Sequence, residues 1–125
     1  MISREYIAGF FDGEGHVSIT ESTRKGTRTA DPKLTVKLTN TYLPVLLDIK
    51  ESYGGLIYKQ PKAKEHYLQV YVLSLSVKES KHFLNEMLPY LFIKKRQAET
   101  ALKTILDSLP QKESTSISLR GIKVD

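Results

Sequence analysis

Two acidic side chains near the amino terminus, Asp12 and Glu14, have the types and spacing that could support chemistry. They lie in the segment IAGFFDGEG (residues 7–15), where Gly9 and Gly13 stand four positions apart and share one face of a helix. Small residues at this spacing let two helix backbones approach closely. If two copies of the chain pair through this helix, two Glu14 carboxylates meet near a two-fold axis and need a cation between them. A hard divalent ion such as Mg²⁺ suits these oxygen ligands, and the pattern predicts metal-assisted phosphodiester hydrolysis.

The same two acids have a simpler interpretation. Asp12 could be an acid at the end of a helix, and Glu14 an exposed residue after a turn, without a chemical role for either. A glycine inside a helix, however, costs roughly 0.5–1 kcal/mol relative to alanine. Two glycines in so short a helix therefore need a reason, and the close approach of a second helix supplies one.

The composition is that of a small basic domain. The chain has 125 residues, and 19 lysines and arginines against 14 acids give a net charge of +5. Such a domain favours a polyanionic partner without requiring one. The absence of cysteine excludes a disulfide framework and a thiolate zinc site. The sequence shows no targeting signal and no membrane span, so we expect a soluble intracellular protein, in a prokaryotic cytoplasm or an organelle.

Hydrophobic periodicity predicts an α+β fold with the element order αββαββα and a C-terminal extension. Pro44 is tolerated only in the first turn of the second helix, and Gly54 and Gly55 end that helix. We expect one domain over residues 1–113 and a polar tail over residues 114–125. The expected helices cover residues 4–12, 42–53, 78–88 and 95–109, and the expected strands cover residues 16–24, 33–40, 56–61 and 66–75.

One face of the expected antiparallel sheet is apolar, and the other is polar along its whole width. The polar face has several basic residues and almost no acids, and it mixes in serine, threonine, glutamine and tyrosine. Because such side chains donate to phosphates and read base edges, we expect this face to bind double-stranded DNA. An ordinary solvated face is the alternative. The residues of the polar face are Ser18, Thr20, Ser22, Arg24, Lys33, Thr35, Lys37, Tyr58, Gln60, Lys62, Tyr67, Gln69 and Tyr71.

The segment IAGFFDGEG resembles the LAGLIDADG motif of the homing endonucleases. Ile7 stands for the first leucine, and Glu14 takes the place of the acid that binds metal in that family, where aspartate is commoner. The element order and the segment LFIKKRQA, which begins at Leu91, also resemble single-motif homodimeric members. The resemblance covers about residues 3–113. The motif matches outright at Ala8, Gly9, Asp12 and Gly15.

This resemblance implies a saddle-shaped antiparallel sheet backed by helices, and it implies roles for several residues. Glu14 is expected to bind Mg²⁺ through its carboxylate and Gly15 through its backbone carbonyl, with Mn²⁺ or Ca²⁺ able to substitute in binding. Lys94 falls on the family's active-site lysine, which stabilises developing charge or orients water. Asn40 falls where relatives carry an amide that positions water. Asp12 is expected to set the helix end and the dimer contact rather than to act in catalysis. The expected dimer interface comprises Ile7, Ala8, Gly9, Phe11, Asp12 and Gly13.

The function that follows is that of an enzyme, a divalent-metal-dependent DNA endonuclease of intron homing. With one motif, two identical chains are needed to contact both halves of a pseudo-palindromic site. The homodimer is expected to hydrolyse both strands of a long DNA site and to leave 3′ overhangs, without a small-molecule cofactor. An intron RNA maturase or a non-cleaving DNA-binding protein of the same fold is the alternative. A basic structural protein of the ribosomal type is a third interpretation, but it leaves the two helical glycines unexplained.

Overall fold

The computed structural model describes residues 2–20 and 32–107. Several expectations fall outside these residues. They concern Ser22 and Arg24 on the polar face, the end of the last helix at residues 108–109, and the domain boundary at residue 113 with the tail that follows it. Within the described residues, no helix combines the length and the apolar character needed to cross a membrane.

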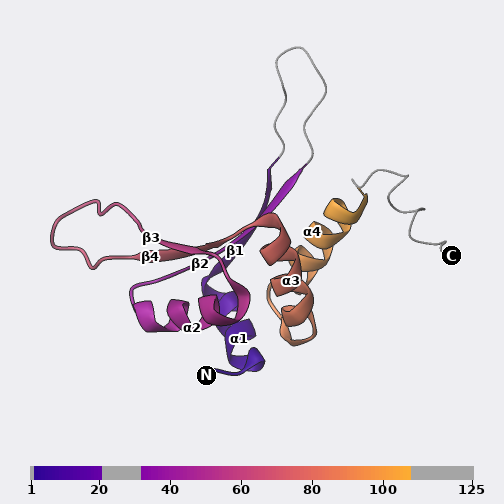
Figure 1. Cartoon of the computed structure of the whole chain (residues 1–125), viewed down its shortest axis with the longest axis horizontal. Coiled ribbons are helices and arrows are strands. Elements are labelled where there is room, and N and C mark those ends of the chain that lie inside the picture. Colours follow the sequence, from indigo (N-terminus) through magenta and orange to yellow (C-terminus); the bar gives the residue numbers. More distant parts are fainter. Residues whose placement is uncertain (1, 21–31, 108–125) are drawn as a thin grey trace, which may run out of the picture.

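The described residues form an α+β fold with the element order predicted from the sequence (Figure 1). A short 3₁₀ helix, η1, separates the third and fourth α-helices. The elements are α1 (Arg4–Glu14), β1 (Gly15–Thr20), β2 (Lys33–Asn40), α2 (Leu43–Tyr53), β3 (Leu56–Lys59), β4 (Tyr71–Leu75), α3 (Val77–Met87), η1 (Leu88–Tyr90) and α4 (Lys95–Asp107).

The four strands form one antiparallel sheet in the order β1–β2–β4–β3. Along β2, the side chains of Leu34, Val36 and Leu38 are fully buried, while the residues between them remain partly or fully exposed. This alternation with period two gives the sheet one buried face and one open face. Figure 1 shows the helices on one side of the sheet, while β1 and β2 run out in one direction and β3 and β4 in another. The helix-backed antiparallel sheet expected from the sequence is therefore confirmed.

An aromatic cluster joins three helices beneath the sheet. The ring of Phe11 on α1 meets the ring of Phe83 on α3 edge to face, with centroids 5.2 Å apart. The ring of Tyr53 on α2 meets Phe83 in the same way at 5.1 Å. Edge-to-face pairs of buried aromatic rings add roughly 0.5–1.5 kcal/mol each beyond the burial of their surface. The face of α1 that carries Phe11 is thus committed to the core of its own chain.

Helix α3 begins with a capping box and is tied to the sheet by one buried hydroxyl. Ser76 accepts from the N–H of Glu79, and the Glu79 carboxylate accepts from the N–H of Ser76. One turn on, the buried Ser80 hydroxyl accepts from the N–H of Val36 at 3.0 Å and donates to the carbonyl of Leu75 at 3.3 Å. These bonds fix α3 against β2 and the end of β4.

The first helix is longer than the sequence predicts. We expected α1 to end near Asp12, because Gly13 and Gly15 are helix breakers, yet α1 continues through Glu14. The N–H of Gly15 donates to the carbonyl of Phe11, and the chain turns there into extended backbone. A single glycine such as Gly13 lowers helix stability without preventing a helix, so tertiary packing decides where α1 ends.

The fourth strand is shorter than the sequence predicts. It begins at Tyr71 rather than at His66, and β3 ends at Lys59 rather than at Pro61. The segment between them turns back on itself, with the N–H of Tyr67 donating to the carbonyl of Lys64. Local turn geometry in this polar stretch overrides the alternation that suggested a strand.

We predict that the capping box makes the stability of the fold sensitive to acid. The bond from the N–H of Ser76 holds the pKa of Glu79 below its ordinary value, and Lys50 nearby acts in the same direction. A lowered native pKa stabilises the fold fully above the unfolded pKa, and this stabilisation is lost as pH falls through the native pKa. Glu79→Gln should therefore lower the free energy of unfolding at pH 6 more than at pH 3, as measured by urea denaturation at both values.

The matched control for this experiment is Glu51→Gln. Glu51 is an exposed carboxylate on α2 that has no hydrogen-bond partner among the described residues. Its replacement should change the pH dependence less than Glu79→Gln does. Equal losses at pH 6 and pH 3 for Glu79→Gln would contradict the prediction.

Candidate active site

The carboxylate of Glu14 stands at the carboxyl end of α1, directly before β1. The side chain is exposed, and the last turn of α1 contains no basic residue. Within the described part of the chain, no basic side chain forms an ion pair with Glu14. The carboxyl end of a helix carries a partial negative charge, so an unpaired carboxylate there is electrostatically unfavourable. A bound cation would relieve both charges, and the donor set of carboxylate and carbonyl oxygens suits a hard divalent ion.

Asp12, two positions earlier, has a different environment. It is buried, at 8% exposure, and it accepts hydrogen bonds from the backbone N–H groups of Phe92 at 2.8 Å and Lys94 at 2.9 Å. Burial opposes ionisation of this carboxyl, but these backbone donors and the Lys94 ammonium together hold the pKa of Asp12 below its ordinary value. Asp12 is therefore an ionised carboxylate whose oxygens are already engaged.

Lys94 returns to the same helix end. Its Nζ donates to the backbone carbonyl of Asp12 at 2.6 Å and lies 5.8 Å from the centre of the Phe11 ring. The side chain is half-buried, so the ammonium sits at the carboxyl end of α1 rather than in open solvent. The Lys94 ammonium thus binds the carbonyl of Asp12, the residue two positions before Glu14 in α1. Its neighbour Lys95 is exposed and begins α4.

Asn40 ends β2 and makes a local hydrogen bond. Its Oδ1 accepts from the N–H of Tyr42 at 2.8 Å, which closes the turn between β2 and α2. In the alternation of β2, Asn40 shares the face of Leu38, which is the face the helices cover. Its neighbour Thr39 is on the open face instead. The contacts of Asn40 therefore favour a structural role in the turn over the positioning of water.

The strand register assigns six residues of the predicted polar face to the open side of the sheet. Ser18 pairs with Thr35, and Thr20 pairs with Lys33. Lys37 lies between His16 on β1 and Ser74 on β4, and Tyr58 pairs with Val72 at the other edge. The open face thus forms a continuous polar surface across β1 and β2. The predicted residues found on it are Ser18, Thr20, Lys33, Thr35, Lys37 and Tyr58.

Five predicted DNA-facing residues are not on the open face of the sheet, because β3 and β4 are shorter than expected and the register of β4 turns Tyr71 to the covered face. Tyr71 pairs with Asn40 on the covered face and packs against the core. Lys62, Tyr67 and Gln69 lie in the loop between β3 and β4, as does Gln60 at its start. The Gln69 amide donates to the carbonyl of Gln60 at 2.8 Å, which holds the base of this loop together.

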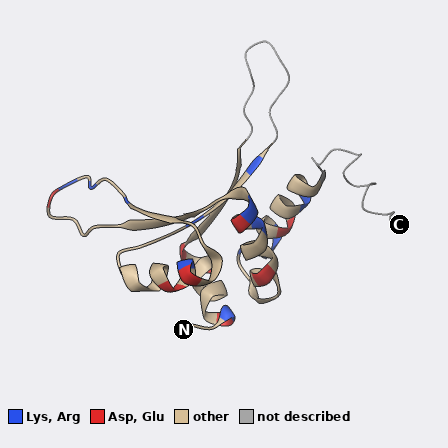
Figure 2. Ribbon diagram, viewed as in Figure 1, with Lys and Arg blue, Asp and Glu red and all other residues tan. Residues whose placement is uncertain are grey.

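Charge is distributed unevenly over the described residues. Figure 2 shows lysines on the loop between β3 and β4 and at the start of β2, while most acidic residues lie on the helices. The lysines of this surface are Lys33, Lys37, Lys62 and Lys64. An open polar sheet with positive charge near its ends is suited to a polyanion lying across it.

The two faces of α1 have separate surroundings. Ile7, Ala8, Phe11 and Asp12, all expected at the dimer interface, are buried within the chain itself. Gly9 and Gly13 are exposed, and a Cβ atom built on either would meet no atom within 4 Å. Of the six residues expected at the dimer interface, only Gly9 and Gly13 are therefore on the exposed face of α1.

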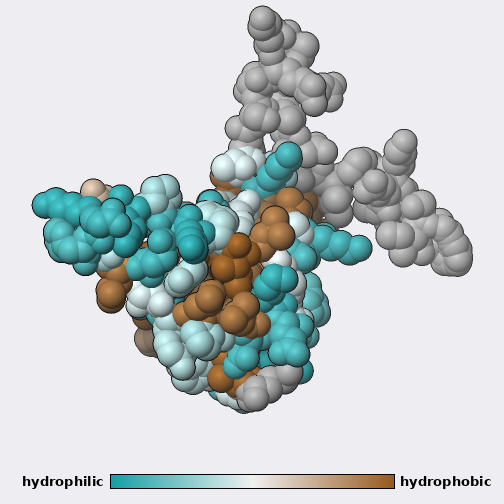
Figure 3. Space-filling view, turned by 60° about the vertical axis from the view of Figure 1, so that its left-hand side comes forward, coloured by the Kyte–Doolittle hydropathy of each residue, from teal (hydrophilic) through white to brown (hydrophobic). Residues whose placement is uncertain are grey.

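A groove lined by both polar and apolar side chains adjoins the exposed face of α1. It has a volume of about 360 Å³ and lies between Tyr6 and Phe10 of α1 and Pro44 and Val45 of α2. The view in Figure 3 shows hydrophobic side chains gathered on one face of the molecule among hydrophilic ones. The side chain of Phe92 is another exposed apolar group, at 89% exposure. It lies near the end of α1, because the N–H of Phe92 donates to the Asp12 carboxylate.

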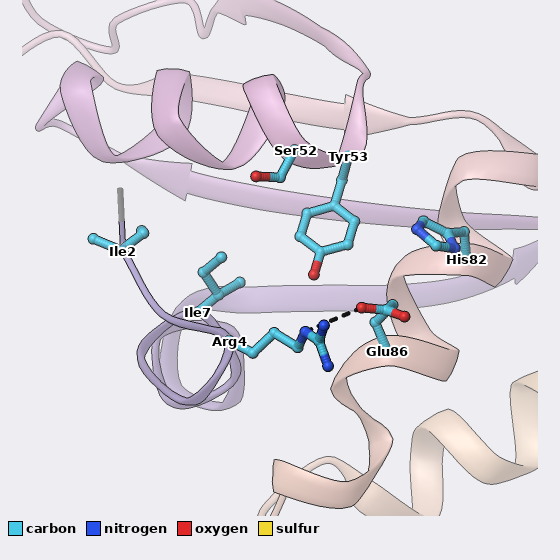
Figure 4. A pocket seen from close by; sticks show the side chains of 7 residues that line it. All are labelled: Ile2, Arg4, Ile7, Ser52, Tyr53, His82 and Glu86. Atoms are coloured by element: carbon cyan, nitrogen blue, oxygen red, sulfur yellow. Dashed lines mark ion pairs between the residues drawn. The ribbon is translucent and has the colours of Figure 1, made fainter.

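A second hollow, of about 340 Å³, lies between α1, α2 and α3 (Figure 4). Arg4 and Glu86 form an ion pair across it at 3.2 Å, and the hydroxyl of Tyr53 points into it. Burial and the charge of Glu86 raise the pKa of Tyr53. None of its lining residues belongs to the cluster of Asp12, Glu14 and Lys94, so this hollow is separate from the candidate active site.

The family model of the LAGLIDADG endonucleases matches residues 7–105, and the chain belongs to this family. The nuclease and DNA-binding character inferred from the sequence is thereby confirmed at the level of the family. No individually curated protein matches the sequence.

Solved structures of homing endonucleases share the fold. The chain is 22% identical to I-CvuI, with a TM-score of 0.63. The match covers 90% of this chain and 71% of I-CvuI. The archaeal intron-encoded I-Vdi141I is 27% identical, with a TM-score of 0.60 and coverage of 80% and 64%. I-GzeII is 20% identical, with a TM-score of 0.67, and the match covers 93% of this chain but 41% of that one.

We predict that Gly15 is required at the junction of α1 and β1, whereas Gly13 is not required by the fold of one chain. A Cβ atom on Gly15 would overlap the Phe11 ring and lie 2.8 Å from the Phe11 carbonyl, which is part of the backbone. Gly15→Ala should therefore lower the free energy of unfolding by about 1–3 kcal/mol, the usual cost of overpacking.

Gly13→Ala is the matched control, because a Cβ atom there meets open space. It should leave the free energy of unfolding unchanged or raise it slightly. Both variants are measured by urea denaturation at a concentration where sedimentation shows single chains. A Gly15→Ala variant as stable as Gly13→Ala would mean that the described junction is wrong.

Proposed function

We propose that this protein is a homodimeric, divalent-metal-dependent endonuclease that hydrolyses both strands of a long pseudo-palindromic DNA site and leaves 3′ overhangs. The observation that carries the proposal is that the Lys94 ammonium binds at the end of α1 that carries Glu14, directly before the first strand of the sheet. An unpaired carboxylate and an ammonium at the edge of a basic surface are suited to a phosphate backbone.

Glu14 and the carbonyl of Gly15 would hold the metal ion, with Mg²⁺ as the working ion and Mn²⁺ or Ca²⁺ as substitutes in binding. When bound, the ion would polarise the scissile phosphate and lower the pKa of water. Lys94, held at the same helix end, would stabilise the negative charge that develops on the phosphate oxygens. The described residues include no group of three or more metal-binding side chains, so the remaining ligands would come from water, DNA or a second chain.

A second copy of the chain would complete the enzyme. Gly9 and Gly13 have open space around them, so the packing of one chain gives no reason for two helical glycines that each cost roughly 0.5–1 kcal/mol. A partner helix on the exposed face of α1 supplies that reason, because its backbone could approach where a side chain would block it. Pairing there brings two Glu14 residues to one two-fold axis and sets two sheets in line along DNA.

Relatives of the same fold support DNA as the substrate. The solved structures of I-CvuI and I-Vdi141I are complexes with DNA, and I-CvuI was studied with Mg and with Ca. In this chain, Ser18, Thr35 and Lys37 on the open face are types that contact phosphates and base edges. Two such faces would span both halves of a symmetric site.

We predict that Glu14→Gln removes cleavage but retains DNA binding, because glutamine keeps the size of the side chain but loses the charge that attracts the metal ion. Wild-type protein with Mg²⁺ is first used to select cleaved sites from a random double-stranded DNA library. Single-turnover cleavage of a selected site is then compared with binding measured in Ca²⁺. The expected loss of rate is about 10²-fold or more, as for other groups that stabilise transition-state charge.

Glu5→Gln provides the control for this variant. Glu5 is an exposed acid at the opposite end of α1, and its replacement should leave the cleavage rate unchanged. If Glu14→Gln cuts as fast as wild type, the metal assignment is wrong. If the wild-type protein binds DNA but cuts none with Mg²⁺ or Mn²⁺, a non-cleaving DNA-binding function replaces the proposal.

We also predict that Gly9→Ala weakens the dimer without weakening the fold. The added methyl group has room in one chain but would separate two closely packed helices. Overpacking of this kind costs about 1–3 kcal/mol, which corresponds to a dimer weaker by about 5- to 150-fold. Sedimentation equilibrium measures association, and urea denaturation measures the fold.

Glu99→Ala is the control, because Glu99 is exposed on α4 and lines a hollow that contains no residue of α1. It should leave association unchanged. An unchanged dimer for Gly9→Ala, or one chain per DNA site for the wild-type protein, would exclude pairing through this face of α1.

A further inference from the structure

We infer that Asp12 is the positioning residue of the active-site lysine, and that it holds Lys94 through its carboxylate and its backbone carbonyl together. This inference rests on the proposed function, since it concerns how the cleavage site is assembled. It differs from the role that the sequence resemblance implied, which was limited to the helix end and the dimer contact.

The carboxylate of Asp12 fixes the backbone on both sides of Ile93. Oδ2 accepts from the N–H of Phe92 at 2.8 Å, and Oδ1 accepts from the N–H of Lys94 at 2.9 Å. Leu91 before this segment is buried, while Phe92 and Ile93 are 89% and 71% exposed. The apolar side chains between Leu91 and Lys94 therefore do not anchor the segment in the core of the chain, and the bonds to Asp12 do.

The carbonyl of the same residue fixes the other end of Lys94. Nζ donates to the Asp12 carbonyl at 2.6 Å, so both the backbone and the ammonium of Lys94 are bound to one residue. A free lysine side chain carries about 2 kcal/mol of rotamer entropy. Holding both ends removes most of that freedom before DNA binds, which is the preorganisation that a charge-stabilising group needs.

The contact also joins two helix ends of opposite polarity. The N–H of Ala98 donates to the carbonyl of Lys94, so Lys94 directly precedes α4 and accepts its first backbone hydrogen bond. The Asp12 carboxylate therefore lies at the positive amino end of α4, while the Lys94 ammonium lies at the negative carboxyl end of α1. Each charge is favourable at the helix end it meets. The hydrogen bonds between Asp12 and Lys94 therefore hold the start of α4 against the end of the helix that carries Glu14.

The test is a double-mutant cycle with Asp12→Asn and Lys94→Met. Asparagine keeps the shape of the side chain and the backbone carbonyl, but its amide nitrogen cannot accept from a backbone N–H. Asp12→Asn should slow single-turnover cleavage about tenfold or more, because small displacements of a catalytic group are costly, while DNA binding in Ca²⁺ stays the same. In the Lys94→Met background, Asp12→Asn should slow cleavage by less than about twofold, because Asp12 then has no ammonium to position.

A structural role alone would give a different result. Ser80→Ala leaves the N–H of Val36 and the carbonyl of Leu75 without their buried partner. Neither group bonds to Asp12, Glu14 or Lys94, so the variant destabilises the fold without removing a bond of the site. At a temperature where both variants stay folded, Ser80→Ala should cut at the wild-type rate. The inference is overturned if Ser80→Ala slows cleavage as much as Asp12→Asn, or if the effects of Asp12→Asn and Lys94→Met multiply.

A second readout does not depend on cleavage. In the metal-free protein, Asp12→Asn should speed amide hydrogen exchange at Phe92 and Lys94, while exchange at Ala98 within α4 changes less. Unchanged exchange at Phe92 and Lys94 would overturn the inference. If the wild-type protein cuts no DNA, the proposed function fails by itself, and these exchange rates alone decide whether Asp12 positions Lys94.

Discussion

The contact between Asp12 and the backbone before α4 determines how the parts of this molecule are related. The residues that it joins lie 80 and 82 positions apart in the chain, yet their donors and acceptors meet at distances of 2.6–2.9 Å. Charge-assisted hydrogen bonds of this length are among the stronger ones in proteins, and here they are partly sheltered from water. Because β1 leaves α1 directly after Glu14, the same helix end is also the origin of the sheet. The carboxyl end of α1 therefore both binds Lys94 and begins the first strand of the sheet.

The two faces of the sheet have different roles: one packs against the helices, and the other presents polar side chains. Its covered face carries Leu34, Val36 and Leu38, which pack against the helices and stabilise the fold. Its open face carries polar and basic residues in rows that the strand pairing defines, and these rows contribute little to the core. Recognition and stability therefore depend on alternate residues of the same strands. The lysines near the strand ends add an electrostatic attraction that does not depend on the exact contacts in between.

The sequence predicted the order of elements because the hydrophobic period and the glycines act locally. The strand over β2 was predicted to the residue, since its alternation is regular and both faces are clear. Where local signals compete with packing, the prediction was wrong. Gly13 looked like the end of a helix that packing extends, and the alternation after His66 looked like a strand although a turn forms there. One consequence was that Tyr71 was assigned to the wrong face.

The candidate site was predictable in its residue types but not in its contacts. Glu14 and Lys94 followed from a motif, and the structure brings them to one helix end. The partners of Asp12 could not be read from the sequence, because they are backbone groups whose positions depend on the tertiary fold. The same limit applies to Asn40, whose amide closes a turn, and to the separation of α1 into a face buried in its own chain and a face with free space.

The strand order has an evolutionary consequence. The pairs β1–β2 and β3–β4 occupy opposite halves of the sheet, and the first residue of β1 directly follows Glu14. Mutations on the outer rows, or in the loop that follows Lys59, can accumulate without disturbing the helix junction. A lineage of such proteins could thus drift from one nucleotide sequence to another by small steps, while the hydrolytic apparatus is inherited unchanged.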